Sequence, residues 1–295
     1  MKIIVTGSLG RVGKPLTKTL VDKGHLVTVI SSNPEKQKDI EALGATAAIG
    51  KMEDVDFLTS VFKGADAIHA MIPPTHAVPD PMARNISLGE CLAKAIGQSG
   101  VKRVVYISSY GAHLDKGTGL IVGHHHIENA LNALDLEALT HLRATYIYYN
   151  LYAYVNMIKT AGFIEANYGG DDRVVLVSPS DIAAAAVEAL EGKDTGKKMS
   201  YVASDERTCN EIAHVLGEAI GKPDLKWITQ TDEQMQSGML ANGVPETVAS
   251  QLVEMFGACH TGLLHEDYDL HKPKTFGKEK IEDFAKEFAA AFNQE

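Results

Sequence analysis

Residues 6–13 read Thr-Gly-Ser-Leu-Gly-Arg-Val-Gly and follow a short apolar run, Lys2–Thr6, that is typical of a buried strand. A helical pattern of apolar residues begins inside this stretch and ends before Gly24. In such a unit the first glycine permits a tight turn, the second lets the backbone approach a diphosphate, and the third lets helix and strand pack closely. Free N–H groups at the start of the helix favour phosphate. The residues expected to bind a dinucleotide here are Thr6, Gly7, Leu9, Gly10, Arg11, Val12 and Gly13.

The rest of the first half alternates short apolar runs with amphipathic segments, which is typical of repeated βαβ units. The fold class is therefore predicted as α/β, a Rossmann-type doubly wound parallel sheet with a smaller, mostly helical C-terminal part. We expect an NAD(P)-binding Rossmann domain over residues 1–150 and a substrate-binding part over 151–295, with residues 173–204 returning to the first domain. Further strands are expected at Leu26–Ile30, Ala45–Ile49, Ala67–Ile72, Arg103–Ser108 and around Leu139–Ile147.

Helix-start signals mark the region beyond residue 150. Ser180 is the expected cap of a helix that ends near Leu190, and Phe276–Phe292 is expected to close the chain as an amphipathic helix. Capping boxes, in which two side chains satisfy each other's backbone N–H groups, are predicted for the pairs Thr208 with Glu211 and Thr231 with Gln234.

The composition excludes several classes of function. Of 295 residues, 45% are hydrophobic and 22% charged, as in an ordinary soluble globular protein. Its 28 basic and 38 acidic residues leave a formal net charge of −10, so direct binding to nucleic acid or to an anionic membrane is not expected. No apolar run approaches the roughly 20 residues that span a bilayer. Three widely spaced cysteines suit a reducing compartment, and the prediction is a cytoplasmic protein.

The residues that follow the second strand bear on the choice of dinucleotide. An NAD site commonly places Asp or Glu about 20 residues after the glycines, where the carboxylate binds the ribose 2′-hydroxyl. At that distance this chain has Ser31, Ser32 and Asn33, and no carboxylate. Arg11 and Lys36 could neutralise a 2′-phosphate, or could be solvated surface cations. The prediction is NADP(H) in preference to NAD(H).

The glycine spacing is GxxGxxG, preceded by Thr, rather than GxGxxG. Further short motifs follow along the chain: Asn33-Pro34-Glu35-Lys36, Ile107–Ala112, His126-Ile127-Glu128, Leu142-Arg143, Ser180–Ala183 and Thr275-Phe276. In this order, and over nearly the whole chain, they resemble the NmrA-like branch of the atypical short-chain dehydrogenases/reductases. Within that branch the chain is most similar to the bacterial NAD(P)H:quinone oxidoreductases.

The resemblance implies that loops after several strands line the cofactor and that the stretch after residue 147 enters the substrate pocket. It also implies direct hydride transfer without a flavin. The cofactor-lining residues implied by position are Met71, Ile72, Pro73 and Ser108. The implied substrate-binding residues, for which a place in the core is the alternative, are Tyr148, Tyr149 and Asn150.

Short-chain dehydrogenases typically use Tyr-x-x-x-Lys, whose tyrosine protonates the reduced carbonyl. The stretch downstream of Ser108, through Gly123–Asn129, contains no such pair, so we expect an NADPH-dependent oxidoreductase without this motif. Reduction of a ketone leaves an alkoxide, which needs a positioned proton donor. Reduction of a quinone leaves a hydroquinone anion, whose conjugate acid has a pKa of about 10, like tyrosine, and which can take a proton from water. A small planar acceptor, a quinone first, is the predicted substrate.

Three histidines follow one another at residues 124–126. Consecutive side chains on a helix or strand cannot all face one ion, and no carboxylate or cysteine cluster completes a ligand set, so no metal is predicted. His126 matches the His-Ile-Glu position of the family and is the candidate catalytic residue, as a proton donor or as a polar wall of the pocket. An exposed histidine without a role is the alternative.

A second class of function stays open. NmrA-like proteins include regulators that bind a dinucleotide and signal through a protein partner, and the missing Tyr-x-x-x-Lys fits such a redox sensor equally well. An epimerase or an isoflavone-type reductase is disfavoured, because those sites resemble ones that use the missing tyrosine or lysine. The expected partner of the reductase is a small molecule. The oligomeric state is not predicted, and a homodimer is left open.

Overall fold

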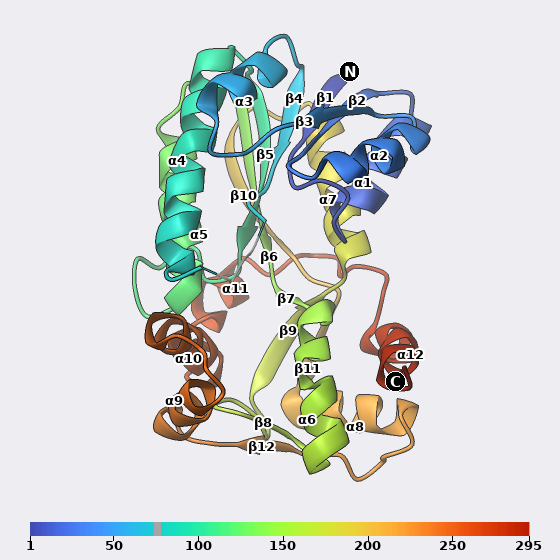
Figure 1. Ribbon diagram of the computed structural model, residues 1–295, viewed down its shortest axis with the longest axis vertical. Coiled ribbons are helices and arrows are strands. Elements are labelled where there is room, and N and C mark those ends of the chain that lie inside the picture. Colours follow the sequence, from blue (N-terminus) through green and yellow to red (C-terminus); the bar gives the residue numbers. More distant parts are fainter. Residues whose placement is uncertain (74–77, 295) are drawn as a thin grey trace.

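The computed structural model describes residues 1–73 and 78–294 and contains a seven-stranded sheet in which all neighbouring strands are parallel (Figure 1). The strand order is β10-β6-β5-β4-β1-β2-β3, so the direction of winding reverses between β1 and β4. The predicted Rossmann-type doubly wound sheet is confirmed. Its strands are β1 (Lys2–Val5), β2 (Leu26–Ser31), β3 (Thr46–Ile49), β4 (Ala67–Ala70), β5 (Arg103–Ser109), β6 (Ala138–Ala144) and β10 (Gly196–Val202).

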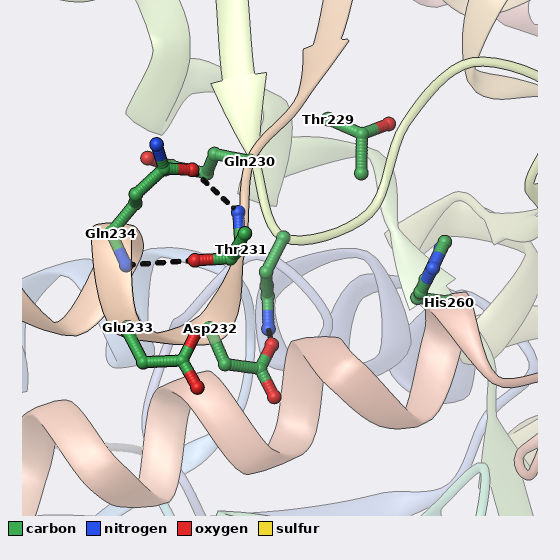
Figure 2. Close-up of a pocket in the computed structure, with 8 residues that line it drawn as sticks. Thr229, Gln230, Thr231, Asp232, Glu233, Gln234 and His260 are labelled. Atoms are coloured by element: carbon green, nitrogen blue, oxygen red, sulfur yellow. Dashed lines mark hydrogen bonds between the residues drawn. The ribbon is translucent and has the colours of Figure 1, made fainter.

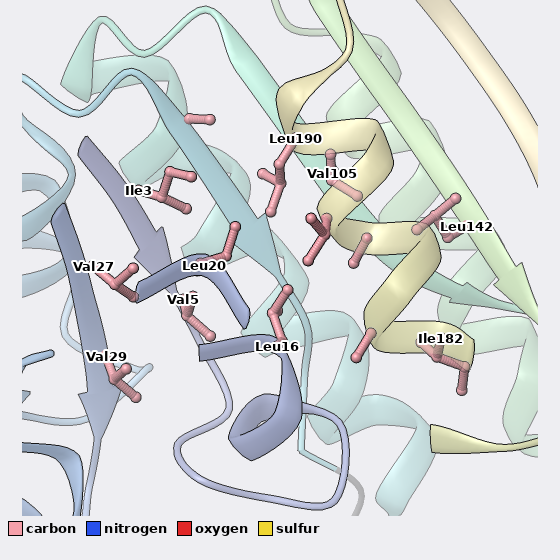
Figure 3. Packing of buried hydrophobic residues seen from close by; sticks show 14 of the residues in the cluster. Ile3, Val5, Leu16, Leu20, Val27, Val29, Val105, Leu142, Ile182 and Leu190 are labelled. Atoms are coloured by element: carbon pink, nitrogen blue, oxygen red, sulfur yellow. The ribbon is translucent and has the colours of Figure 1, made fainter. Parts of the chain in front are cut away.

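Helices cover both faces of this sheet. Figure 1 shows α3, α4 and α5 on one side and α1 and α7 on the other. Ile3, Leu16 and Leu190 belong to the core under α1 and α7 (Figure 3), and Ile4 and Leu92 belong to the core on the opposite face. The helices of this larger part of the molecule are α1 (Gly13–Asp22), η1 (Pro34–Lys36), α2 (Gln37–Ala42), α3 (Val55–Phe62), α4 (Pro81–Ser99), η2 (Gly119–Ile121), α5 (Val122–Asn132) and α7 (Pro179–Glu191).

The remaining elements form a smaller part below the sheet in Figure 1. Two small sheets, ordered β11-β9-β7 and β12-β8, support several helices around their own hydrophobic core, which includes Tyr168, Trp227 and Phe288. Its elements are β7 (Tyr146–Ile147), η3 (Tyr148–Tyr154), α6 (Val155–Ala161), β8 (Ile164–Ala166), β9 (Arg173–Val177), β11 (Asp205–Thr208), α8 (Cys209–Ala219), β12 (Trp227–Thr229), α9 (Asp232–Ala241), α10 (Glu246–His260), α11 (His265–Leu270) and α12 (Ile281–Phe292).

Several expected boundaries differ from the structure. The strand expected over Ala67–Ile72 ends at Ala70. The strand expected through Ile147 divides, because β6 ends at Ala144 and the chain then joins β9 of another sheet as β7. The side chain that caps α7 is Ser178, which accepts a hydrogen bond from Asp181 N at 3.0 Å, rather than Ser180. The last helix begins at Ile281 rather than Phe276.

The late start of α12 has a physical cause in α7. The carboxylate of Asp181 accepts hydrogen bonds from the backbone N–H groups of Lys278 and Glu279, at 3.0 and 3.2 Å. These two groups are therefore bonded to α7, and the segment before Ile281 is held outside the helix. By contrast, the two predicted capping boxes, at the starts of α8 and α9, are confirmed.

The chain crosses between the two parts more than once. After residue 150 it returns to the large sheet through α7, which packs on α1, and through β10, which pairs with β6 over seven residues. We therefore keep, as a proposal, a Rossmann domain over residues 1–150 with 173–204 returning to it, and a C-terminal part over 151–295.

Candidate functional site

The glycine-rich turn connects β1 to α1 at the carboxyl edge of the large sheet. Gly7 has φ +88°. Ser8, with φ +59°, is the only described residue other than a glycine that has a positive φ. A Cβ atom on Gly13 would lie 2.1 Å from the carbonyl oxygen of Ser8, whereas one on Gly10 would have no neighbour nearer than 3.5 Å. Gly10 is also exposed. Gly13 is thus required for packing inside the turn, and Gly10 leaves an open backbone surface.

The start of α1 has no side-chain cap from any of the described residues, and Val12 occupies the cap position. The N–H group of Lys14 donates to the carbonyl of Gly10 at 2.9 Å, and Pro15 has no N–H group. The N–H groups of Val12 and Gly13, with the positive end of the helix dipole, are therefore those that suit an anion. Together with the open backbone at Gly10, this arrangement fits the diphosphate of a dinucleotide.

Residues from the end of β4 complete one side of the turn. The hydroxyl of Thr6 donates to the carbonyl of Met71 at 2.8 Å and accepts from its N–H at 2.8 Å. A Cβ atom on Gly7 would lie 2.3 Å from the sulfur of Met71, so this side chain covers the turn. Ile72 is buried and Pro73 is exposed. The structure therefore brings Met71 together with Thr6 and Gly7 of the turn.

Residues from the end of β2 complete the other side. The hydroxyl of Ser8 donates to that of Ser31 at 3.0 Å, and Ser31 is buried. Asn33 accepts a hydrogen bond from Glu35 N at 2.9 Å and so begins η1. Ser32, Asn33 and Lys36 are exposed, and Lys36 pairs with Asp39 at 3.1 Å. An exposed pair of this kind is weak, so the ammonium of Lys36 can exchange it for another anion.

Arg11 points to the C-terminal part. Its guanidinium carbon lies 3.5 Å from the ring centroid of Tyr149, and the Tyr149 hydroxyl donates to Glu287 of α12 at 3.2 Å. Arg11, Tyr149 and Glu287 line a cavity of about 600 Å³, together with Tyr152. The turn thus meets η3 through a cation–π contact, and η3 is joined to α12 by the Tyr149–Glu287 hydrogen bond.

The other two predicted substrate residues differ in exposure. Tyr148 is fully buried, its ring stacks on Phe284 with centroids 5.1 Å apart, and its hydroxyl donates to the carbonyl of Glu279 at 3.1 Å. Asn150 is exposed. The structure therefore places Tyr148 in the hydrophobic core and leaves Tyr149 and Asn150 nearer to solvent.

The three consecutive histidines point in different directions on α5. His126 is exposed and its ring lies 5.9 Å from that of His125. His124 turns toward the sheet, where its Nδ1 and the Tyr106 hydroxyl form a hydrogen bond of 2.8 Å. Burial lowers the pKa of His124 to about 4. The structure does not bring His126 together with the residues of the glycine-rich turn.

A buried ionic network, which the sequence did not predict, lies at the carboxyl ends of β5 and β6. Glu128 accepts from the Ser108 hydroxyl at 2.5 Å and from two nitrogens of Arg143 at 3.0 and 2.7 Å. Arg143 also donates to Asp267 of α11 at 3.0 Å, and the Tyr201 hydroxyl donates to the same carboxylate at 2.6 Å. One signal existed in the sequence, because Arg143 is a charged residue within the strand that was expected around Leu139–Ile147.

The network keeps its carboxylates ionised. Burial acts to raise the pKa of Glu128, but hydrogen bonds from Arg143 and Ser108 outweigh it, and the pKa lies below its usual value. The hydroxyl proton of Ser108 is therefore directed to Glu128. Ser108, which was predicted to line the cofactor, is buried. Through its hydrogen bond to Glu128 it anchors α5 to the sheet.

A Tyr-x-x-x-Lys spacing does occur once in the chain, at Tyr268 and Lys272, outside the stretch after β5. Tyr268 is fully buried on α11, and its hydroxyl has no hydrogen-bond partner among the described residues. Lys272 pairs with Glu206 at 2.5 Å and lies 5.7 Å from the ring centroid of Tyr268. The pair comes from the C-terminal part and not from α5, the helix that follows β5.

Within residues 1–73 and 78–294, no group of three or more His, Cys, Asp or Glu side chains could hold a metal ion. None of the helices in that part of the chain combines the length and apolar character needed to cross a bilayer.

Comparison with known proteins places this geometry in a family. The probable pinoresinol-lariciresinol reductase 3 of Arabidopsis thaliana is 22% identical over 221 residues, which is 71% of this chain and 69% of that protein. An NADPH-dependent quinone oxidoreductase of Escherichia coli, solved with NADPH, is 22% identical with a TM-score of 0.82 and covers 99% of this chain and 100% of its own.

A triphenylmethane reductase of Citrobacter sp., solved with NADP(H), is 21% identical with a TM-score of 0.79 and covers 97% of this chain and 99% of its own. At these identities the structural likeness shows a shared fold. The model of the NmrA-like family matches residues 1–283. With the glycine-rich turn and the parallel sheet already described, that match shows that the chain belongs to the NmrA-like family.

Proposed function

We propose that this protein is an NAD(P)H-dependent reductase that transfers hydride directly to a small planar acceptor, a quinone first. The observation that carries the proposal is the uncapped start of α1 beside the open backbone of Gly10, which fits a diphosphate. When bound there, the dinucleotide supplies the hydride, and no flavin or metal takes part. The three similar proteins named above are all reductases by name, and two were solved with NADPH or NADP(H).

We assign the preference for NADP(H) over NAD(H) to the exposed end of β2. Ser32, Asn33 and Lys36 face solvent there, and Lys36 carries a positive charge that a 2′-phosphate can pair with. Arg11 contributes less directly to pairing with the 2′-phosphate than its position in the turn suggests, because its guanidinium lies on the ring of Tyr149. Met71, Ile72 and Pro73 would line the site from β4.

Hydride transfer to a quinone does not require a proton donor from the protein. The hydroxyls of Ser108 and Tyr148 both donate inside the protein, to Glu128 and to a backbone carbonyl. An acceptor whose reduced anion takes its proton from water suits such a site, as a quinone does. His126, exposed on α5, remains the proposed donor or pocket wall if a protein proton is used. We place the enzyme in the cytoplasm, and its partners there are small molecules.

The proposal is tested by NADPH oxidation with a panel of quinones and purified protein. We expect turnover well above the rate without protein. Binding of the dinucleotide without turnover on any acceptor would overturn the reductase and favour the alternative, a redox sensor that acts through a protein partner.

A further inference from the structure

A polar cavity of about 480 Å³ lies in the C-terminal part, away from the glycine-rich turn and its neighbours. It opens where the parallel strands β8 and β12 end and where α9 begins, and the last residue of α10 closes it on another side. The carboxyl ends of parallel strands followed by a helix are a common place for ligands. Eight residues line this cavity, and all of them are polar.

One lining side chain is buried with an unsatisfied acceptor. Asn167 is 2% exposed, and its Nδ2 donates to Asp232 at 2.7 Å and to the carbonyl of Val253 at 2.9 Å. Because both of these partners are acceptors, the amide orientation is fixed. Its Oδ1 is then left without a hydrogen-bond partner among the described residues. Buried carbonyl groups are seldom left unpaired, so a donor is expected to complete this one.

A second acceptor is oriented by a carboxylate. His260 Nδ1 and Asp172 form a contact of 2.8 Å, and Asp172 also accepts from the backbone N–H of Gly169 at 2.8 Å. In the tautomer that donates from Nδ1 to this carboxylate, the ring presents Nε2 as an acceptor. His260 lines the cavity, and Figure 2 shows it across from the first turn of α9.

The charge of the lining is negative. Asp232 and Glu233 lie side by side on the first turn of α9 (Figure 2). The described residues that line the cavity include no lysine or arginine. The N-terminal dipole of α9 carries only about half a positive charge, which two carboxylates exceed. The cavity therefore offers acceptors and negative charge, and its complement is a cation that donates several hydrogen bonds.

We propose that this cavity binds an aliphatic ammonium compound, such as a small amine or diamine, with Asn167, Asp232, Glu233 and His260 as its acceptors. An ammonium group has three donors and no acceptor, which matches this set. The site is separate from the dinucleotide site and does not depend on the proposed reductase activity.

The test is calorimetric titration of the purified full-length protein with putrescine and, as a neutral analogue of the same length, 1,4-butanediol. We expect putrescine to bind with one site per chain, butanediol not to bind, and added salt to weaken the binding. Glu233→Gln removes a charge without touching the hydrogen bonds of Asn167, and should weaken putrescine at least tenfold. Asp232→Asn should do the same, with its melting temperature measured in parallel.

A matched control is available at the start of another helix. Asp56 is an exposed acid in the first turn of α3, so Asp56→Asn removes an equivalent charge and should leave putrescine binding unchanged. No binding of putrescine, equal weakening by Asp56→Asn, or full retention in Glu233→Gln would each overturn the proposal. Binding of Mg²⁺ in place of putrescine would overturn it as well, because the site would then be a metal site.

Discussion

At the scale of single residues, the stability of the fold depends on the buried ion pair between Arg143 and Glu128. Both side chains are 8% exposed. Removing one partner of a buried pair leaves the other charge uncompensated, which typically costs about 3–5 kcal/mol. We expect Arg143→Met to lower the free energy of unfolding by that amount in urea titrations, and the double variant Arg143→Met/Glu128→Leu to recover part of it.

Lys18→Met is the comparison for that experiment. Lys18 pairs with Asp22 on the surface of α1, where both side chains are at least 60% exposed. Exposed pairs contribute about 0–1 kcal/mol, so this change should be small. If Arg143→Met were no more costly than Lys18→Met, the buried network would not stabilise the fold as described.

We expect the free energy of unfolding to depend on pH through the protonation of His69 in β4. His69 is fully buried, neither ring nitrogen has a partner among the described residues, and burial lowers its pKa to about 4 from 6.5. The unfolded chain therefore binds this proton more readily than the folded one. The stabilisation is fully present above pH 6.5 and is lost as the pH falls toward 4, by up to roughly 3 kcal/mol. His124 acts in the same direction.

The measurement is the free energy of unfolding against pH for the wild type and His69→Leu. The variant should show a shallower decline between pH 6.5 and 4.5, by up to about 1.4 kcal/mol for each pH unit, because one proton fewer is taken up on unfolding. Parallel curves for the two proteins would contradict the assignment to His69.

At the scale of elements, the glycine-rich turn and η3 are joined by the contact of Arg11 with Tyr149. A partly exposed cation–π contact contributes about 0.5–1 kcal/mol. We expect that coupling energy in a double-mutant cycle of Arg11→Met and Tyr149→Leu, read from unfolding free energies. Lys18→Met combined with Tyr149→Leu should be additive. Additive effects in the first cycle as well would mean that the contact adds no stability.

The elements also show what a sequence can predict. The turn at residues 6–13, the strands of the first half and both capping boxes follow from local patterns, because the signals lie within a few residues of one another. The start of α12 does not, since Asp181 binds its leading segment from 97 residues away. The buried network was missed for the same reason: Arg143 and Asp267 are 124 residues apart, and only the fold brings them together.

Periodicity also failed to separate core from pocket among the tyrosines. Tyr148 and Tyr149 are adjacent in the sequence, yet Tyr148 is buried against Phe284 and Tyr149 lies under Arg11 at a cavity. Their placement depends on how η3 turns between the sheet and α12. That turn is tertiary information.

At the scale of the whole molecule, buried polar contacts connect the two parts. Arg143 of the large sheet bonds Asp267 of α11, and the Tyr110 hydroxyl and His265 Nδ1 are 2.6 Å apart. Parts that share such contacts should unfold together. The single tryptophan, Trp227, is buried in the C-terminal core and reports on that part, whereas circular dichroism reports on both.

We therefore expect tryptophan fluorescence and circular dichroism to give coincident urea transitions, with one midpoint. The Arg143–Asp267 and Tyr110–His265 contacts provide the coupling. A fluorescence transition at clearly lower urea would show that the C-terminal part unfolds by itself, and would contradict the joint core.

The central claim, that the glycine-rich turn binds the dinucleotide, is tested most directly by the NADPH dissociation constants of the wild type and Gly10→Ala. A Cβ atom at residue 10 has no neighbour nearer than 3.5 Å, so the fold and melting temperature should be unchanged. The methyl group would nonetheless occupy the surface that the diphosphate approaches, and we expect affinity to fall at least tenfold, roughly 1.4 kcal/mol. Equal NADPH affinity in the two proteins, or no binding to the wild type, would contradict the account.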